Sequence, residues 1–348
     1  SVVWATKEGA ELATQGDRVY PVSIVTTSVG HVAATTYNSR PRDDNGNPRN
    51  RINEGVLSKY NGTNGALMWS KNFGVEFMYS RIRSKLSVSG ETVYVSGDFQ
   101  GKNSTAFAPL TTTSCADGNA RSAVVAAFDV SPSDAPVASW VAVIGCGSRG
   151  GGTFVHGDFL YVTGDNLEEP LTLLPADFVD AANCTMTGAL GGFLVKLNRA
   201  DGKCVWAKDM APSKRVVADS NSVWTMYSGR YPYHFDATHT VTPADYDVIM
   251  GRFQASDGVG MWGTTMGGLG RDYAYDMAMT PIGPVTVGYS DTETLSLGNV
   301  TANNLQHKAF EAEVGVPDSN RAGLYAMFVV LVSATDAMPS CVSSCPSG

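Results

Sequence analysis

The chain of 348 residues is poor in charge and has no long hydrophobic run. Charged residues make up 17% of it and the formal net charge is −8, so no basic stripe is available to neutralise nucleic-acid phosphates. No apolar stretch approaches the roughly 18 residues of a transmembrane helix. We therefore expect neither a nucleic-acid partner nor insertion into a membrane. The chain begins at Ser1 without a signal peptide, and we expect either that one was removed or that this is an internal fragment.

Familiar catalytic motifs are missing as well. The five histidines form no HExxH pair, and there is no GxSxG elbow. Residues Gly145–Gly150 spell GxGxxG, but a strand pattern follows where a dinucleotide site requires a helix. The sequence therefore predicts no reaction, and we expect that the protein is not an enzyme.

What the chain has instead is an internal repeat. Gly192–Met210 reads as a strand, a tight turn at Asp201-Gly202 and a returning strand with a tryptophan, because its side chains alternate with the two-residue period of a strand. Glu54–Asn72 aligns with it without a gap, and Val248–Thr264 and a degenerate Val124–Trp140 are further copies. Self-similarity of this kind is the strongest indication of a repeat fold.

A second hairpin pattern precedes each copy of the first. Val88–Asp98 is echoed by Val155–Asp165, with weaker echoes at Ser28–Thr36, Asn221–Gly229 and Ile282–Gly288. Two hairpins make four strands, and the 37 glycines suit many tight turns. We predict an all-β fold, a five-bladed β-propeller of four-stranded antiparallel blades. The expected blades cover about 18–74, 75–146, 147–211, 212–267 and 268–336.

The last repeat lacks its returning strand, and Val2–Thr6 resembles the missing one. Pairing of the two would close the ring and remove sheet edges that invite aggregation. We therefore expect a single domain over residues 1–336, with residues 1–8 as the closing strand. Residues 337–348 would be a cysteine-containing tail or a junction.

The alternating strands, "VYVSGDF" at 93–99 and "FLVKLNRADGKCVWAKDM" at 193–210, carry a family resemblance. They resemble the β-propeller repeats grouped as pyrroloquinoline-quinone-like and SBBP-type, over the chain from Ser1 to about Asp336. The resemblance implies the propeller fold. It does not imply one function, since such propellers serve enzymes, adhesins and scaffolds, and it does not imply quinone binding.

Two sets of side chains recur with the repeats. Trp69, Trp140, Trp206 and Trp262 share one hairpin position, where blade-to-blade packing is the expected role and a ring of sugar-stacking aromatics the alternative. Asp98 and Asp165 follow the marker glycines of two blades. Turn chemistry is the expected role of these carboxylates, and a cation or sugar site near a propeller axis the alternative.

Two further sites are candidates for binding. Asp43, Asn45, Asn47 and Glu54 match calcium-loop positions one, three, five and twelve, although Pro48 stands where the loop needs glycine. A solvated turn is the simpler interpretation, and calcium at this loop is the one metal candidate. In the segment 227–235, the aromatic side chains of Tyr231, Tyr233 and His234 would form either a binding surface or packing under a loop.

The cysteines and glycosylation sequons indicate the compartment. Four Asn-x-Ser/Thr sequons and six cysteines without CxxC spacing favour an oxidising, secreted setting. Repeat alignment favours the pairs Cys115–Cys146 and Cys184–Cys204, which leaves Cys341 and Cys345 to pair locally or with another chain. The expected glycosylation sites are Asn61, Asn103, Asn183 and Asn299.

Together these features predict a secreted, glycosylated and non-catalytic propeller. We expect a structural or adhesive module at a cell surface or in an extracellular filament, with protein partners or copies of itself, or glycans, as ligands. The alternatives are a carbohydrate-binding, lectin-like propeller and a glycosidase that uses axial carboxylates. No cofactor other than calcium is expected.

Overall fold

The computed structural model divides into two compact units, Ser1–Lys214 and Arg215–Gly348. Each unit is described by itself. The described residues are 18–28, 30–39, 52–73, 77–78, 86–100, 103–104, 107, 110, 112–113, 121–132, 134–166, 173–174, 184–186, 190–235, 240–268, 270–290, 294–297, 300–303, 326–332 and 339–340. No helix among these residues is long and apolar enough to cross a membrane.

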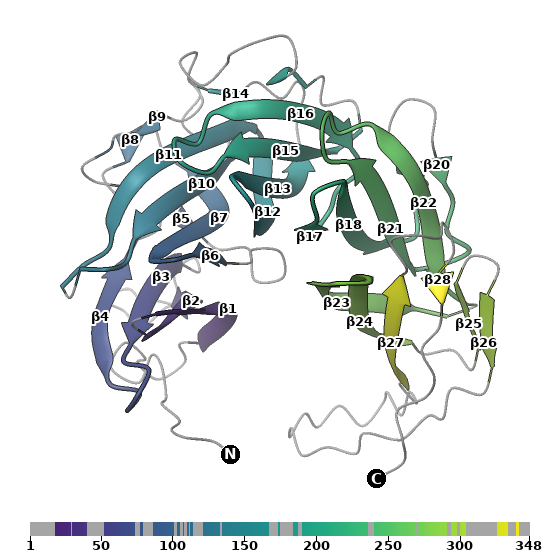
Figure 1. Ribbon diagram of the computed structural model, residues 1–348, viewed down its shortest axis with the longest axis horizontal. Helices are drawn as coiled ribbons and strands as arrows, with labels where there is room; N and C mark the ends of the chain where they lie inside the picture. Colours follow the sequence, from purple (N-terminus) through teal and green to yellow (C-terminus); the bar gives the residue numbers. More distant parts are fainter. Residues whose placement is uncertain are drawn as a thin grey trace, which may run out of the picture. The chain divides into compact units, whose positions relative to one another are not determined.

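The first unit contains three sheets, each with four antiparallel strands in chain order (Figure 1). Two short strands, β5 and β14, extend the second sheet, and β8 pairs with β9 separately. The first sheet is β1 (Arg18–Thr27), β2 (Gly30–Ser39), β3 (Ile52–Tyr60) and β4 (Leu67–Asn72). The second is β6 (Ser87–Ser89), β7 (Thr92–Gln100), β10 (Arg121–Asp129) and β11 (Val137–Cys146), with β5 (Phe77–Met78), β14 (Leu173–Leu174), β8 (Asn103–Ser104) and β9 (Thr112–Thr113) beside it. The third is β12 (Ser148–His156), β13 (Phe159–Asn166), β15 (Gly192–Asn198) and β16 (Cys204–Met210).

The second unit repeats the same arrangement in two sheets. Short strands β25 and β26 extend the fourth sheet, and β19 pairs with β20. The fourth sheet is β17 (Arg215–Ala218), β18 (Ser222–Gly229), β21 (Asp247–Gln254) and β22 (Gly260–Gly267), with β25 (Thr294–Leu297), β26 (Val300–Asn303), β19 (Tyr233–His234) and β20 (Thr240–Val241). The fifth is β23 (Asp272–Thr280), β24 (Gly283–Ser290), β27 (Ala326–Val332) and β28 (Pro339–Ser340). The predicted all-β class and four-stranded antiparallel sheets are thus confirmed.

The closing strand is not tested. Val2–Thr6 lies outside the described residues, and the edge of β27 that it was expected to cover is paired at Leu331 and Val332 with β28. The two-residue β28 comes from the C-terminal end of the chain. Closure by the N-terminal strand remains a prediction.

The hairpin tryptophans (Trp69, Trp140, Trp206 and Trp262) occupy the same register in four sheets. In each sheet the pairing of the third and fourth strands shifts by one residue just before the turn, which places the tryptophan opposite the last residue before the shift. Trp69 and Trp140 are buried and donate their Nε1–H groups to the carbonyl oxygens of Pro132 (3.3 Å) and Arg199 (3.0 Å). Both acceptors lie in the corresponding turn of the next sheet, so packing between successive sheets is the role of these two side chains.

The turn at Asp201-Gly202 is shaped for this contact. Gly202 has a φ of +73°, which glycine adopts without steric cost, and its N–H donates to the Asn198 carbonyl oxygen at 2.8 Å. A Cβ atom at Gly202 would lie 2.5 Å from the Trp140 ring. The tryptophan of the second sheet therefore rests directly on the turn of the third.

The Cys184–Cys204 disulfide predicted from the repeat alignment is present, with Cα atoms 6.2 Å apart and a sequence separation of 20. Both cysteines are buried, and Cys204 begins β16. The bridge thus ties the segment before β15 to the outer strand of the third sheet. Cys146 ends β11, while its expected partner Cys115, like Cys341 and Cys345, lies outside the described residues.

We expect Gly202→Ala to destabilise the protein more than Gly157→Ala. Both glycines have positive φ, but a Cβ at Gly157 would meet nothing within 4 Å. The control should cost about 1–2 kcal/mol for its backbone conformation alone. The Gly202 variant should lose about 1–3 kcal/mol more, because the methyl group must displace Trp140. Urea unfolding measures both, and equal losses would contradict the docking of Trp140 on this turn.

We also expect the double variant Cys184→Ala/Cys204→Ala to be less stable than the parent protein under oxidising conditions. A bridge that closes a loop of this length contributes about 3 kcal/mol by restricting the unfolded chain. Thermal and urea unfolding of the two proteins in parallel provide the measurement. Identical transitions would show that the bridge does not constrain the unfolded state.

Candidate functional site

The calcium candidates receive no structural support. Asp43, Asn45 and Asn47 lie outside the described residues, and Glu54 lies within β3. In the described part of the chain, no group of three or more histidine, cysteine, aspartate or glutamate side chains could hold a metal ion. Calcium at residues 43–54 therefore stays a prediction.

The glycosylation sequons are only partly within the described residues. Asn61 lies in the turn between β3 and β4, where its Oδ1 accepts hydrogen bonds from the N–H groups of Thr63 (2.8 Å) and Asn64 (3.3 Å). Asn103 begins β8, while Asn183 and Asn299 lie outside the described residues. Asn61 is therefore the sequon whose turn location the structure shows.

The aromatic segment at residues 231–234 is divided between core and surface. Tyr233 is buried and packs on Phe235, with ring centroids 4.8 Å apart, whereas the Tyr231 side chain is 70% exposed. His234 Nδ1 lies 2.9 Å from Thr240 Oγ1, across the β19–β20 pair. Tyr233 is therefore a packing residue, and Tyr231 is the exposed ring of the segment.

The repeated carboxylates Asp98 and Asp165 are both buried. Asp98 Oδ1 accepts the N–H of Gly150 at 3.0 Å, which links β7 of the second sheet to β12 of the third. The expected role in turns is therefore wrong for Asp98, because its partner belongs to the neighbouring sheet.

A different site stands out in the second unit, on the first two strands of the fifth sheet. Tyr273 lies opposite Tyr289 in the β23–β24 pair, and their stacked rings have centroids 4.9 Å apart. Tyr246 contacts Tyr273 at 4.6 Å, and Tyr275 contacts Tyr289 at 5.4 Å. These four rings, in the order Tyr246, Tyr273, Tyr289 and Tyr275, form a tyrosine ladder. The Tyr275 side chain at its end is 60% exposed.

A β-bulge in β23 determines where Tyr275 and Asp276 lie relative to the ladder. The register shifts between Ala274 and Asp276, so Tyr275 is an extra residue on β23. Because of this extra residue, Asp276 pairs with Val287 and lies on the same face of the sheet as Tyr273. The bulge therefore brings a carboxylate and the exposed Tyr275 ring to one place.

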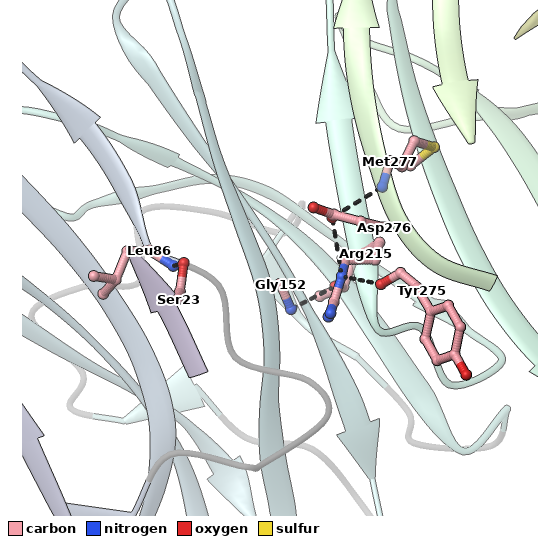
Figure 2. Close-up of polar contacts among 8 residues, drawn as sticks. Ser23, Leu86, Gly152, Arg215, Tyr275, Asp276 and Met277 are labelled. Carbon is pink, nitrogen blue, oxygen red and sulfur yellow. Dashed lines mark hydrogen bonds and ion pairs between the residues drawn. The ribbon is translucent and has the colours of Figure 1, made fainter. Parts of the chain in front are cut away.

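Arg215 fixes the Asp276 carboxylate (Figure 2). Its Nε donates to the Tyr275 carbonyl oxygen at 3.1 Å and lies 3.2 Å from Asp276 Oδ1, which also accepts the Met277 N–H at 2.9 Å. The Arg215 side chain is 16% exposed and that of Asp276 is 49% exposed. Burial lowers the pKa of Arg215 and Asp276 raises it, but a guanidinium remains charged in proteins. The site thus has an accessible carboxylate held by a mostly buried cation.

Uncharged groups make the comparable contacts in the first unit. The Leu86 N–H donates to Ser23 Oγ at 3.1 Å, and the Ser87 and Thr153 hydroxyls lie 3.0 Å apart (Figure 2 shows the first of these). The first contact joins β1 to the residue before β6, and the second joins β6 to β12. The Arg215–Asp276 ion pair likewise joins the first strands β17 and β23 in the second unit. An ion pair at this place is therefore a departure from the pattern of the first unit.

Buried acids anchor the other end of the ladder. The Asp272 N–H donates to the Tyr246 carbonyl oxygen at 2.6 Å, and Asp272 Oδ2 accepts the Gly268 N–H at 2.9 Å. Asp247 is 2% exposed, and its Oδ2 accepts the Ala244 N–H at 2.8 Å, while Oδ1 is buried with no hydrogen-bond partner. Burial raises the pKa of Asp247, although the hydrogen bond from Ala244 opposes the shift. The ladder is therefore attached to a carboxyl group whose ionisation is disfavoured by burial.

Sequence reasoning missed this site. The available signal was Asp272-Tyr-Ala-Tyr-Asp276, where the corresponding first strand of the third sheet carries Ser148-Arg-Gly-Gly-Gly-Thr153. Aromatic and acidic side chains in place of glycine indicate that something other than close sheet packing is required there.

Comparisons with known proteins reach only the fold. No family model and no curated protein matches the chain. Among solved structures, a GH43_1 enzyme from Xanthomonas citri complexed with xylose has a TM-score of 0.38 and 11% identity over 93% of this chain and 91% of that chain. A levansucrase mutant from B. megaterium has a TM-score of 0.35 and 10% identity over 95% and 86%. BamB from Moraxella catarrhalis has a TM-score of 0.22 and 11% identity over 78% and 96%.

These neighbours are β-propellers, and the four-stranded sheets of this chain are of the kind that builds them. The neighbours include enzymes, namely the GH43_1 enzyme and the levansucrase, and this contradicts the expectation of a non-catalytic structural or adhesive module. That expectation is corrected. At 10–11% identity and TM-scores below 0.5 these likenesses assign no function, so the case for a function depends on the chain's own residues.

Asp247→Asn should stabilise the protein more at pH 7 than at pH 4. The raised pKa means that ionising Asp247 costs more in the folded than in the unfolded chain. The penalty is absent below the unfolded pKa of about 3.9 and grows as the pH rises above it. Asparagine removes this penalty and retains an oxygen for the Ala244 N–H.

Urea unfolding of both proteins at the two pH values measures the effect. Asp257→Asn is the control, because Asp257 is exposed in the β21–β22 turn. A gain from Asp247→Asn that is equal at both pH values would show that the buried carboxyl does not titrate as described.

Proposed function

We propose that the protein is a carbohydrate-active enzyme that holds a sugar ring against Tyr275 and acts on it with the carboxylate of Asp276. The observation that carries the proposal is the exposed Tyr275 ring beside a half-exposed carboxylate, on one bulged strand. Sugar sites combine a flat apolar surface with a few fixed polar groups. Both elements are supplied here by neighbouring residues.

Each part of the site has a separate task in this proposal. The Tyr275 ring offers its face to the C–H groups of the sugar, and the ladder behind it keeps the ring from turning away. Asp276 acts as the general base and accepts a proton from the water that attacks the anomeric carbon, while the bond from that carbon to the leaving oxygen breaks and the leaving oxygen takes a proton from solvent. Arg215 and the Met277 N–H position the carboxylate for that step.

The five-bladed, closed propeller is part of the same proposal. The five four-stranded sheets would be the blades of a ring whose edges are closed by pairing of the terminal strands. Support comes from the recurrence of the meander and from the docking of Trp69 and Trp140 on the next sheet. In propellers the first strands approach the central channel, which suits a site built on β17 and β23.

The setting that we propose is extracellular. The Cys184–Cys204 disulfide supports an oxidising compartment, and Asn61 in its turn is the first place to look for a glycan. Calcium in the loop at residues 43–54 and glycans as partners complete this view of a secreted protein that works on carbohydrate.

Binding and hydrolysis of oligosaccharides test the proposal. With a panel of neutral oligosaccharides, Tyr275→Ala should weaken binding at least tenfold, the equivalent of about 1.4 kcal/mol, since the stacking face is removed. Asp276→Asn should abolish turnover and leave binding within a few-fold. Tyr231→Ala is the matched control, an exposed tyrosine of the same unit outside the ladder. The proposal is wrong if no oligosaccharide is bound or cleaved, or if the Tyr231 and Tyr275 variants behave alike.

A further inference from the structure

The tyrosine ladder limits the shape of the ligand. Its rings follow one another at 4.6, 4.9 and 5.4 Å, so the inner rings of Tyr273 and Tyr289 are sandwiched between neighbours. Exposure is concentrated in Tyr275 at the end. A stack of this kind presents one flat face, whereas a cage for a quaternary ammonium group needs rings on several sides. A flat ligand such as a sugar ring is therefore favoured.

An exposed aliphatic side chain extends this face. Val287 is partly exposed and lies opposite Asp276 in the β23–β24 pair, two residues from Tyr289. Side chains two residues apart on a strand point to the same side of the sheet. The apolar surface is thus broader than one ring and has the Asp276 carboxylate at its border.

The accessible charge at the exposed end of the ladder is negative. The acidic residues at the ladder are Asp245, Asp272 and Asp276, beside Asp247 with its raised pKa, and the basic ones are Arg215 and Arg271. The Arg215 guanidinium is already engaged by Asp276 and by the Tyr275 carbonyl oxygen. The whole chain has a formal charge of −8 in the same direction. An anionic ligand would be repelled both at the site and on approach.

We infer that the site accepts neutral sugars and excludes sugars that carry a carboxylate, such as uronic acids. This selectivity rests on the proposed function and specifies its substrate class. The physical basis is the half-exposed Asp276 carboxylate beside the stacking face. It accepts hydrogen bonds from hydroxyl groups and repels a second carboxylate.

The test compares oligomers of equal length that differ in charge. Neutral β-1,4-linked glucose oligomers and galacturonic acid oligomers are titrated into the full chain at low and at high salt. The uronate oligomers should bind at least about tenfold more weakly at low salt, and the gap should narrow at high salt because screening weakens the repulsion. Asp276→Asn should reduce the ratio of the affinities for neutral and uronate oligomers severalfold at low salt. Asp257→Asn makes the same change of charge in an exposed turn beyond the far end of β21 and should leave the ratio unchanged.

The outcomes separate the two ideas. Binding of uronate oligomers as tight as that of neutral ones overturns the selectivity and leaves the sugar site in place. An equal shift in the Asp276 and Asp257 variants also overturns it, since the effect would then come from net charge alone. If no oligomer binds, the proposed function fails and the selectivity fails with it.

Discussion

The contact of a tryptophan with the next sheet's turn is the interaction on which the first unit depends. A single four-stranded meander cannot bury its own apolar face, so each sheet is stable only against a neighbour. Trp69 and Trp140 provide that contact by combining ring burial with a hydrogen bond to a turn carbonyl. Truncation of a buried tryptophan typically costs about 3–5 kcal/mol, which is large beside the stability of a domain.

The same hairpin position brings a cation into the interior. Lys59, Lys196 and Arg252 lie opposite Trp69, Trp206 and Trp262 in the strand pairing. Lys59 is fully buried and donates to the Val130 carbonyl oxygen of the second sheet, while Lys196 Nζ lies 3.8 Å from the centre of the Phe159 ring. Burial lowers the pKa of both lysines. Each of the two lysines thus has a specific partner, and its buried charge is tolerated only because that partner is in place.

The sequence predicted the fold well because its signals are local. Tight turns such as Asp201-Gly202 and strands of alternating polarity can be recognised within about 20 residues. Their recurrence in several repeats supports each assignment. The Cys184–Cys204 bridge followed from the same alignment. Pairing between the distant ends of the chain has no such local signal and stays a prediction.

The proposed site could not be predicted from the sequence, for two physical reasons. The bulge at Tyr275 reverses the face on which Asp276 would lie in a regular strand, and no local pattern announces that shift. The second reason is that the repeated acids, which the sequence does single out, are buried in the structure. Asp98 is a carboxylate like those of catalytic sites, but it accepts a hydrogen bond from the Gly150 N–H and so joins two sheets.

The two kinds of acid explain how a repeat fold can acquire a site without losing its packing. Asp98 links sheets from a buried position, and small hydroxyls link first strands at Ser23 and Ser87. In the second unit Arg215 and Asp276 still join β17 to β23, so the connection between sheets is kept. The difference is that Asp276 remains half exposed beside Tyr275. One interaction therefore serves both purposes, since the contact that joins the strands also fixes a carboxylate at the surface.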